Sequence, residues 1–210
     1  MMSFKHMVFI LFMLLNSSLV QASDSDSYRY SKEKIKDRKS LDDAYARFGK
    51  IYKPYVADQS NLDMKISKQL VKIFTLTDMA VIEKVLLLEF IGKVDKGDVP
   101  RDTPHKNYYQ EILEEINAIE ATDKRIIKVQ KDIVAGIKFH IQVLDSWLEA
   151  ARKNEVHTVK NKSGRWVHPG TSAGDKIFYS LFHNYIKKNF SEEYPENLEA
   201  LSRHLCVLVF

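Results

Sequence analysis

Apolar residues recur at helical spacing through most of the chain, and the pattern is clearest after residue 39. Positions three or four residues apart lie on the same face of an α-helix, so each apolar stripe is read as the buried side of a helix. The stripes differ in length but follow one another with short polar breaks. They predict helical stretches that begin at Ser40, Leu62, Asp78, Thr103, Asp123, Asp175 and Pro195.

Several of these stretches open with residues that typically begin a helix. Ser40 and Asp43 have the spacing of a capping box. Thr77 is a candidate N-cap for the third stretch. Thr103-Pro104 places a cap residue before a proline at the first helical position, and Pro195 opens the last stretch. We therefore expect helices to start at these residues.

Two features predict how the helices pack. The stretch 78–94 is apolar on nearly all sides, which is typical of a helix at the centre of a bundle. The longest stretch, 123–152, contains Gly136 in its interior. Glycine costs about 1 kcal/mol relative to alanine there, so we expect this gap to allow a close approach by another helix.

The pattern changes between residues 156 and 168, where short apolar segments flank Asn161-Lys-Ser-Gly164. This arrangement predicts a β-hairpin with a four-residue turn. The fold class predicted from the whole chain is therefore all-α, a bundle of about six helices with one small β-hairpin inserted near 156–168. If Lys160 pairs with Arg165 across the turn, His157 lies directly opposite His168, with Val159 and Trp166 on the same face.

The first 22 residues resemble a secretion signal. Lys5 and His6 precede the unbroken apolar run Met7–Leu15, and small residues lead to a cleavage site after Ala22. The apolar run is about half the roughly 20 residues of a spanning helix, so we expect cleavage rather than anchoring. Residues 23–39 are polar and read as a flexible arm, and 40–210 as one helical domain.

Composition indicates the kind of organism and the compartment in which the exported protein acts. The chain has one cysteine, Cys206, so no disulfide forms within it. Secreted animal domains often contain several, and we therefore expect a bacterial envelope protein, with the periplasm favoured and release to the medium as the alternative. The net charge of +4 is a mild excess, well short of what nucleic-acid binding usually requires. No nucleic-acid partner is expected.

Residues 156–175 carry the candidate chemistry. His157 and His168, if opposed, have the spacing to share a metal ion or to act as a pH-sensitive pair. A zinc site normally needs three or four ligands, and the sequence supplies no further one nearby, so an exposed or structural pair is favoured. The helix start near Thr171 and Ser172, with Arg165 and His168 close by, is a candidate anion site.

The segment Gly170-Thr-Ser-Ala-Gly174 matches the nucleophile elbow of α/β-hydrolases. That motif requires a core strand of a parallel sheet, and no β-α alternation precedes it here. A capping box formed by Ser172 and Asp175 explains the pattern better. Elsewhere no H-E-x-x-H or cysteine cluster occurs, and the isolated His140, His183 and His204 are expected to be core or boundary residues.

These observations favour an exported, soluble, non-enzymatic protein of binding, inhibitor or immunity type that contacts a protein partner in the cell envelope. Arginine and aromatic residues are common interface anchors. One alternative is a periplasmic hydrolase or metal-dependent enzyme that uses His157, His168 and Ser172; another is a carrier of apolar ligands. No cofactor is expected, and the oligomeric state is left open. The predicted contact residues are His157, Arg165, Trp166, His168, Thr171 and Ser172.

Overall fold

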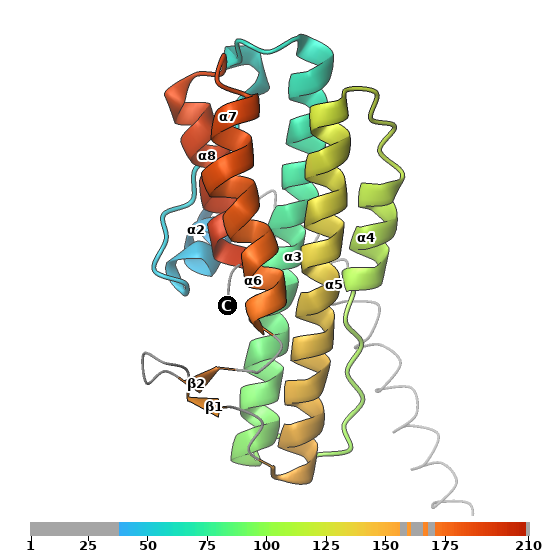
Figure 1. The fold of residues 1–210 in the computed structure, drawn as a ribbon. Helices are drawn as coiled ribbons and strands as arrows, with labels where there is room; N and C mark the ends of the chain where they lie inside the picture. Colours follow the sequence, from blue (N-terminus) through green and yellow to red (C-terminus); the bar gives the residue numbers. More distant parts are fainter. Residues whose placement is uncertain (1–37, 156–158, 161–165, 168–170, 209–210) are drawn as a thin grey trace, which may run out of the picture.

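The computed structural model describes residues 38–155, 159–160, 166–167 and 171–208 of the 210-residue chain. The signal sequence predicted at 1–22 and nearly all of the arm predicted at 23–39 lie outside these residues. In the described part the chain is an all-α bundle of six helices, counting one helix that contains a π-turn (Figure 1). No helix within the described residues is both long and apolar enough to cross a membrane.

The helices follow one another along the chain with short connections. A single turn of 3-10 helix, η1 (Ala57–Gln59), lies between the first two. The helix that contains the π-turn consists of α6, η2 and α7 in continuous sequence. The bounds are α2 (Arg38–Ala46), α3 (Met64–Lys96), α4 (Tyr109–Asn117), α5 (Lys124–Lys153), α6 (Thr171–Tyr179), η2 (Ser180–Ile186), α7 (Lys187–Asn189) and α8 (Pro195–Leu208).

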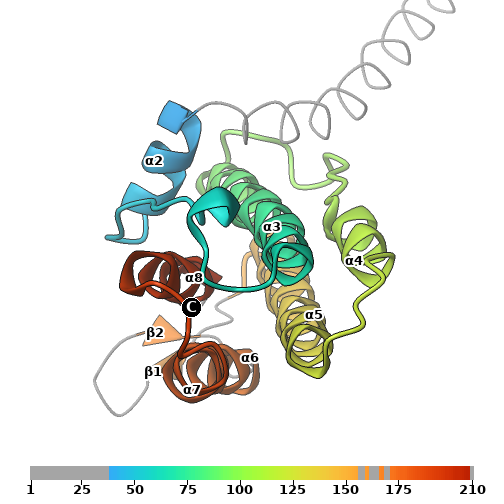
Figure 2. The same ribbon diagram turned by 90° about the horizontal axis from the view of Figure 1, so that it is seen from above.

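α3 lies at the centre of the bundle, as the apolar stretch 78–94 predicts (Figure 2). It is one helix of 33 residues where the sequence pattern indicated two. Thr77 does not cap a second helix: it is fully buried, and its Oγ1 donates to the backbone oxygen of Ile73, 3.0 Å away, within the same helix. The helix begins after Asp63, whose carboxylate accepts from the N–H of Lys65, and ends at Gly97 with φ of 79°.

Two other predicted helix starts are wrong. α2 is helical from Arg38, so Ser40 lies inside the helix and not at its N-cap. α4 begins at Tyr109 and not at Thr103. The backbone N–H of Thr103 closes a turn onto Pro100, and its carbonyl accepts from Nη2 of Arg152 on α5, 3.1 Å away. These two hydrogen bonds hold Thr103 against α5 in a non-helical conformation.

The helix predicted over 123–152 is confirmed as α5, although α3 is longer. Asp123 accepts from the N–H of Arg125 at the start, and Asn154 ends the helix in the left-handed conformation with φ of 57°. The prediction for Gly136 is also confirmed. A Cβ at this position would stand 2.3 Å from Cζ of Phe178 on α6, so the missing side chain makes room for a buried ring.

α3 and α5 run in the same direction, and both begin at the end of the bundle drawn uppermost in Figure 1. α4 and the segments around it carry the chain back between them. The last helix, α8, begins at Pro195 as predicted and continues to Leu208. Its buried residues Leu201, Leu205 and Leu208 join the apolar core around α3.

Candidate functional site

Half of the six predicted contact residues lie outside the part of the chain that the structure describes. His157, Arg165 and His168 are outside the described residues. Trp166 lies in β2 (Trp166–Val167), which pairs antiparallel with β1 (Val159–Lys160). The remaining residues of the predicted hairpin are not described, so the hairpin as a whole stays a prediction.

The register of β1 and β2 differs by one residue from the expected one. Val159 is opposite Val167 and Lys160 is opposite Trp166, where the sequence suggested Lys160 opposite Arg165. Strand side chains alternate between faces, so a shift of one residue changes which residues share a face. The premise that placed His157 directly opposite His168 therefore does not hold.

The segment resembling a nucleophile elbow is the start of a helix. α6 begins at Thr171 and not at Asp175, so Ser172 lies in its first turn and the predicted capping box with Asp175 is wrong. Gly174 lies inside α6. A Cβ there would stand 3.1 Å from Cβ of Phe139 and 3.6 Å from the backbone oxygen of Gly136. Gly174 thus has a packing role, and together with Gly136 it lets α5 and α6 approach closely.

A buried polar cluster that the sequence reasoning missed joins α2, α3 and α8. The Asp78 carboxylate accepts from the Tyr45 hydroxyl at 2.6 Å and from the Tyr52 hydroxyl at 3.3 Å. Nε2 of His204 lies 3.1 Å from Oδ1 of the same carboxylate. The rings of Tyr45, Tyr52 and Phe74 surround the imidazole in edge-on contacts.

The two nitrogens of His204 fix its charge. Nε2 faces the Asp78 carboxylate, and Nδ1 lies 2.7 Å from the backbone oxygen of Ala200. A backbone oxygen and a carboxylate both accept hydrogen bonds, so this arrangement favours the ring with a proton on each nitrogen. Burial favours the neutral ring, but the Asp78 charge and both hydrogen bonds outweigh it and raise the pKa of His204. The cluster is a buried imidazolium–carboxylate pair that attaches α8 and α2 to the central helix.

Lys84, further along α3, is a second buried charged residue with a structural role. Its Nζ donates to the backbone oxygen of Val207, 3.1 Å away, and lies 4.5 Å from the centre of the Phe48 ring. Val207 is in the last turn of α8, where helix carbonyls lack partners within the helix. Burial lowers the pKa of Lys84 to about 7. Lys84 thus caps the end of α8 from inside the core.

Of the three histidines expected in core or boundary positions, two are buried. His204 forms the cluster described above, and His140 packs against the ring of Phe178 with centroids 5.2 Å apart. Burial, reinforced by the charge of Lys84, lowers the pKa of His140. His183 is exposed and stacks on Tyr179.

Glu193 ties two distant surface segments together. Its carboxylate accepts from Tyr55 at 2.7 Å, from Ser60 at 2.5 Å and from the backbone N–H groups of Asn61 and Tyr194. Burial opposes ionisation, but these hydrogen bonds outweigh it and lower the pKa of Glu193. The Glu193 carboxylate therefore has a structural role, as the Asp78 carboxylate does.

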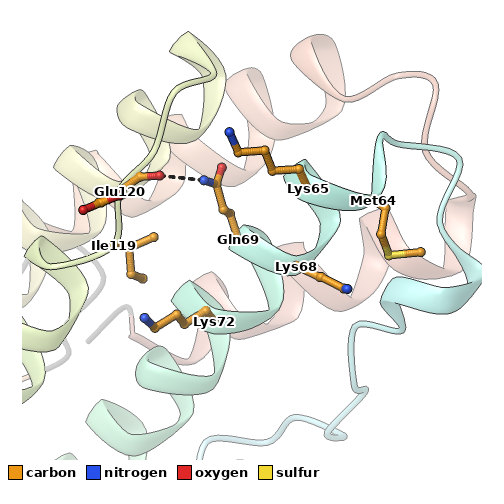
Figure 3. A pocket seen from close by; sticks show the side chains of 7 residues that line it. All are labelled: Met64, Lys65, Lys68, Gln69, Lys72, Ile119 and Glu120. Atoms are coloured by element: carbon orange, nitrogen blue, oxygen red, sulfur yellow. Dashed lines mark hydrogen bonds between the residues drawn. The ribbon is translucent and has the colours of Figure 1, made fainter.

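A pocket of about 490 Å³ opens where α3 begins beside the loop between α4 and α5 (Figure 3). Its surface is mainly apolar near Met64 and Ile119, and lysines stand around it. Gln69 crosses to the loop and donates from Nε2 to the backbone oxygen of Glu120 at 2.7 Å. The lining residues are Met64, Lys65, Lys68, Gln69, Lys72, Ile119 and Glu120.

Within the part of the chain that the structure describes, no group of three or more His, Cys, Asp or Glu side chains is placed to hold a metal ion. The buried Asp78, Lys84 and Glu193 are instead engaged in joining segments. Comparison with family models, with curated proteins and with solved structures finds no match to this chain.

Proposed function

We propose that this chain is an exported, soluble binding protein of inhibitor or immunity type, acting in the periplasm and contacting a protein partner through residues 156–175. The contact residues are the six predicted from the sequence: His157, Arg165, Trp166, His168, Thr171 and Ser172. Trp166 and Arg165 serve as anchors, since aromatic and arginine residues supply much of the binding energy at protein interfaces.

The observation that carries this proposal is the place of β1 and β2 at the periphery of the bundle (Figures 1 and 2). The chain leaves the end of α5 to reach them and returns at the start of α6. α5 and α6 are held close by Gly136 and Gly174. A recognition segment positioned by a rigid helix pair is a common arrangement for binding.

The buried polar groups support the same proposal indirectly. The Asp78–His204 pair, Lys84 and Glu193 all connect segments that are distant in sequence. Because these buried groups hold the fold together, we assign partner binding to residues on the surface.

Affinity capture with purified protein tests the proposal. The bait variants are Arg165→Ala with Trp166→Ala, and a matched control in which exposed Arg101 and Tyr194 are replaced by Ala. Circular dichroism confirms that each variant folds. A protein captured from an envelope extract by the wild type and the control, and recovered at least tenfold less with the 165/166 variant, is the expected result. Equal recovery by all three baits contradicts the proposed contact site.

A further inference from the structure

The lysines around the pocket at the start of α3 are uncompensated. Lys65, Lys68 and Lys72 are exposed, and their side chains form no ion pair or hydrogen bond within the described residues. Some lysines elsewhere on the helices pair with acids four residues away, as in Lys128–Asp132 and Lys153–Glu149. Here Lys68 and Lys72 face each other at that spacing, which destabilises a helix slightly.

The helix ends add to this positive charge. α3 and α5 both begin at this end of the bundle (Figure 1), and neither has an acidic residue in its first turn. The start of a helix carries a partial positive charge, so cations are unfavourable there and anions favourable. The N-cap carboxylates are already engaged, Asp63 with its own helix and Asp123 with Arg125. Positive charge therefore gathers at this pocket from the lysines and from the two helix starts, which makes its surface complementary to an anionic group.

The pocket also selects what kind of anion fits. Glu120 takes part through its backbone oxygen, and its carboxylate is turned away from Gln69 (Figure 3). That bond requires the Gln69 Nε2 to face the loop, because a carbonyl only accepts. The Gln69 Oε1 is then left buried with no hydrogen-bond partner in the described structure, and it offers no surface to a ligand. Beside the lysines, the accessible lining includes the apolar side chains of Met64 and Ile119.

We propose that this pocket binds an acidic segment of a protein partner. The carboxylates of such a segment pair with Lys65, Lys68 and Lys72, and an apolar side chain covers Met64 and Ile119. A peptide supplies both kinds of group, whereas inorganic phosphate supplies no apolar surface. The site is separate from residues 156–175, so the proposal does not depend on the contact region proposed above.

Fluorescence anisotropy tests the site with a fluorescein-labelled octapeptide that alternates glutamate and leucine. The test variant carries Lys65→Gln, Lys68→Gln and Lys72→Gln. The control carries Lys93→Gln, Lys96→Gln and Lys138→Gln, which removes the same charge, with two of the changes at the other end of α3. At about 0.1 M salt we expect the dissociation constant to rise at least tenfold in the test variant and less than threefold in the control.

Two further measurements complete the experiment. The thermal midpoint of the test variant should equal or exceed that of the wild type, because like charges have been removed from a helix start. Inorganic phosphate and phosphatidylglycerol vesicles serve as competing probes. Equal weakening in both variants means unspecific charge attraction and overturns the proposal. Tighter, lysine-dependent binding of vesicles or phosphate than of the peptide also overturns it, in favour of a lipid surface or a free anion.

Discussion

Replacing Gly136 with alanine tests the close contact between α5 and α6 that positions the proposed recognition segment. The added Cβ would stand 2.3 Å from Cζ of Phe178, whose side chain is 0% exposed. Carbon atoms pack favourably at about 3.5–4.0 Å, so the ring must move by roughly 1 Å in a filled core. Overpacking of this kind costs up to about 3 kcal/mol, while alanine returns about 1 kcal/mol of helix propensity. We expect Gly136→Ala to lower the free energy of unfolding by about 2 kcal/mol.

Gly92 on α3 provides the matched control. It is also an interior helix glycine, but nothing lies within 4 Å of a Cβ built on it. Gly92→Ala should therefore stabilise the protein by about 1 kcal/mol. Urea unfolding followed by circular dichroism measures both values. In the double variant Gly136→Ala with Phe178→Leu, we expect the two effects to be less than additive, because the smaller side chain relieves the clash. Equal stabilisation by the two alanine substitutions would refute the described α5–α6 contact.

Four further predictions concern the buried charges and a helix cap. Because the pKa of His204 is raised, the stability that this residue contributes should be full below pH 6.5 and decline as the pH rises through that raised value; the difference in unfolding free energy between wild type and His204→Gln should shrink accordingly. At pH 6, Asp78→Asn should cost about 3–5 kcal/mol by leaving the imidazolium unpaired, and a loss below 1 kcal/mol would exclude the charged pair. For Lys84 the pH dependence runs the other way. Its pKa is lowered to about 7, so the free energy of unfolding should rise between that pH and about 10.5. Urea titrations of Lys84→Met should show a flatter rise. Asp63→Ala should cost about 1 kcal/mol by removing the N-cap of α3, and an unchanged urea midpoint would contradict that cap.

The helical faces were predictable because they depend on local periodicity. The bounds of α5, the start of α8 at Pro195 and the packing role of Gly136 all follow from residues within a few positions of one another. The central place of α3 follows from a stretch that is apolar on nearly all sides.

The errors occur where distant residues decide the outcome. Thr77 and Asp78 have the sequence of a helix start, yet they lie in the middle of α3. Asp78 is tolerated there because Tyr45, Tyr52 and His204 bond to it from positions 33, 26 and 126 residues away. The local signal was a carboxylate at the start of a stretch that is apolar on nearly all sides.

The candidate sites show the same limit. In the observed register Lys160 is opposite Trp166 and not Arg165, and a shift of one residue changes which side chains are opposed. The lysine-lined pocket combines α3 with the loop before α5, and no pattern within α3 alone indicates it. The three lysines are local to α3, but the part of the lining formed by Ile119 and Glu120 is not.

Site-specific photo-crosslinking tests the proposed contact region most directly. A photoreactive phenylalanine derivative at position 166 is compared with the same group at position 194, where Tyr194 is exposed. After irradiation of intact cells that export the protein, we expect a defined covalent adduct with one protein partner from position 166 and none from position 194. No adduct from position 166, or the same adducts from both positions, would contradict a binding function carried by residues 156–175.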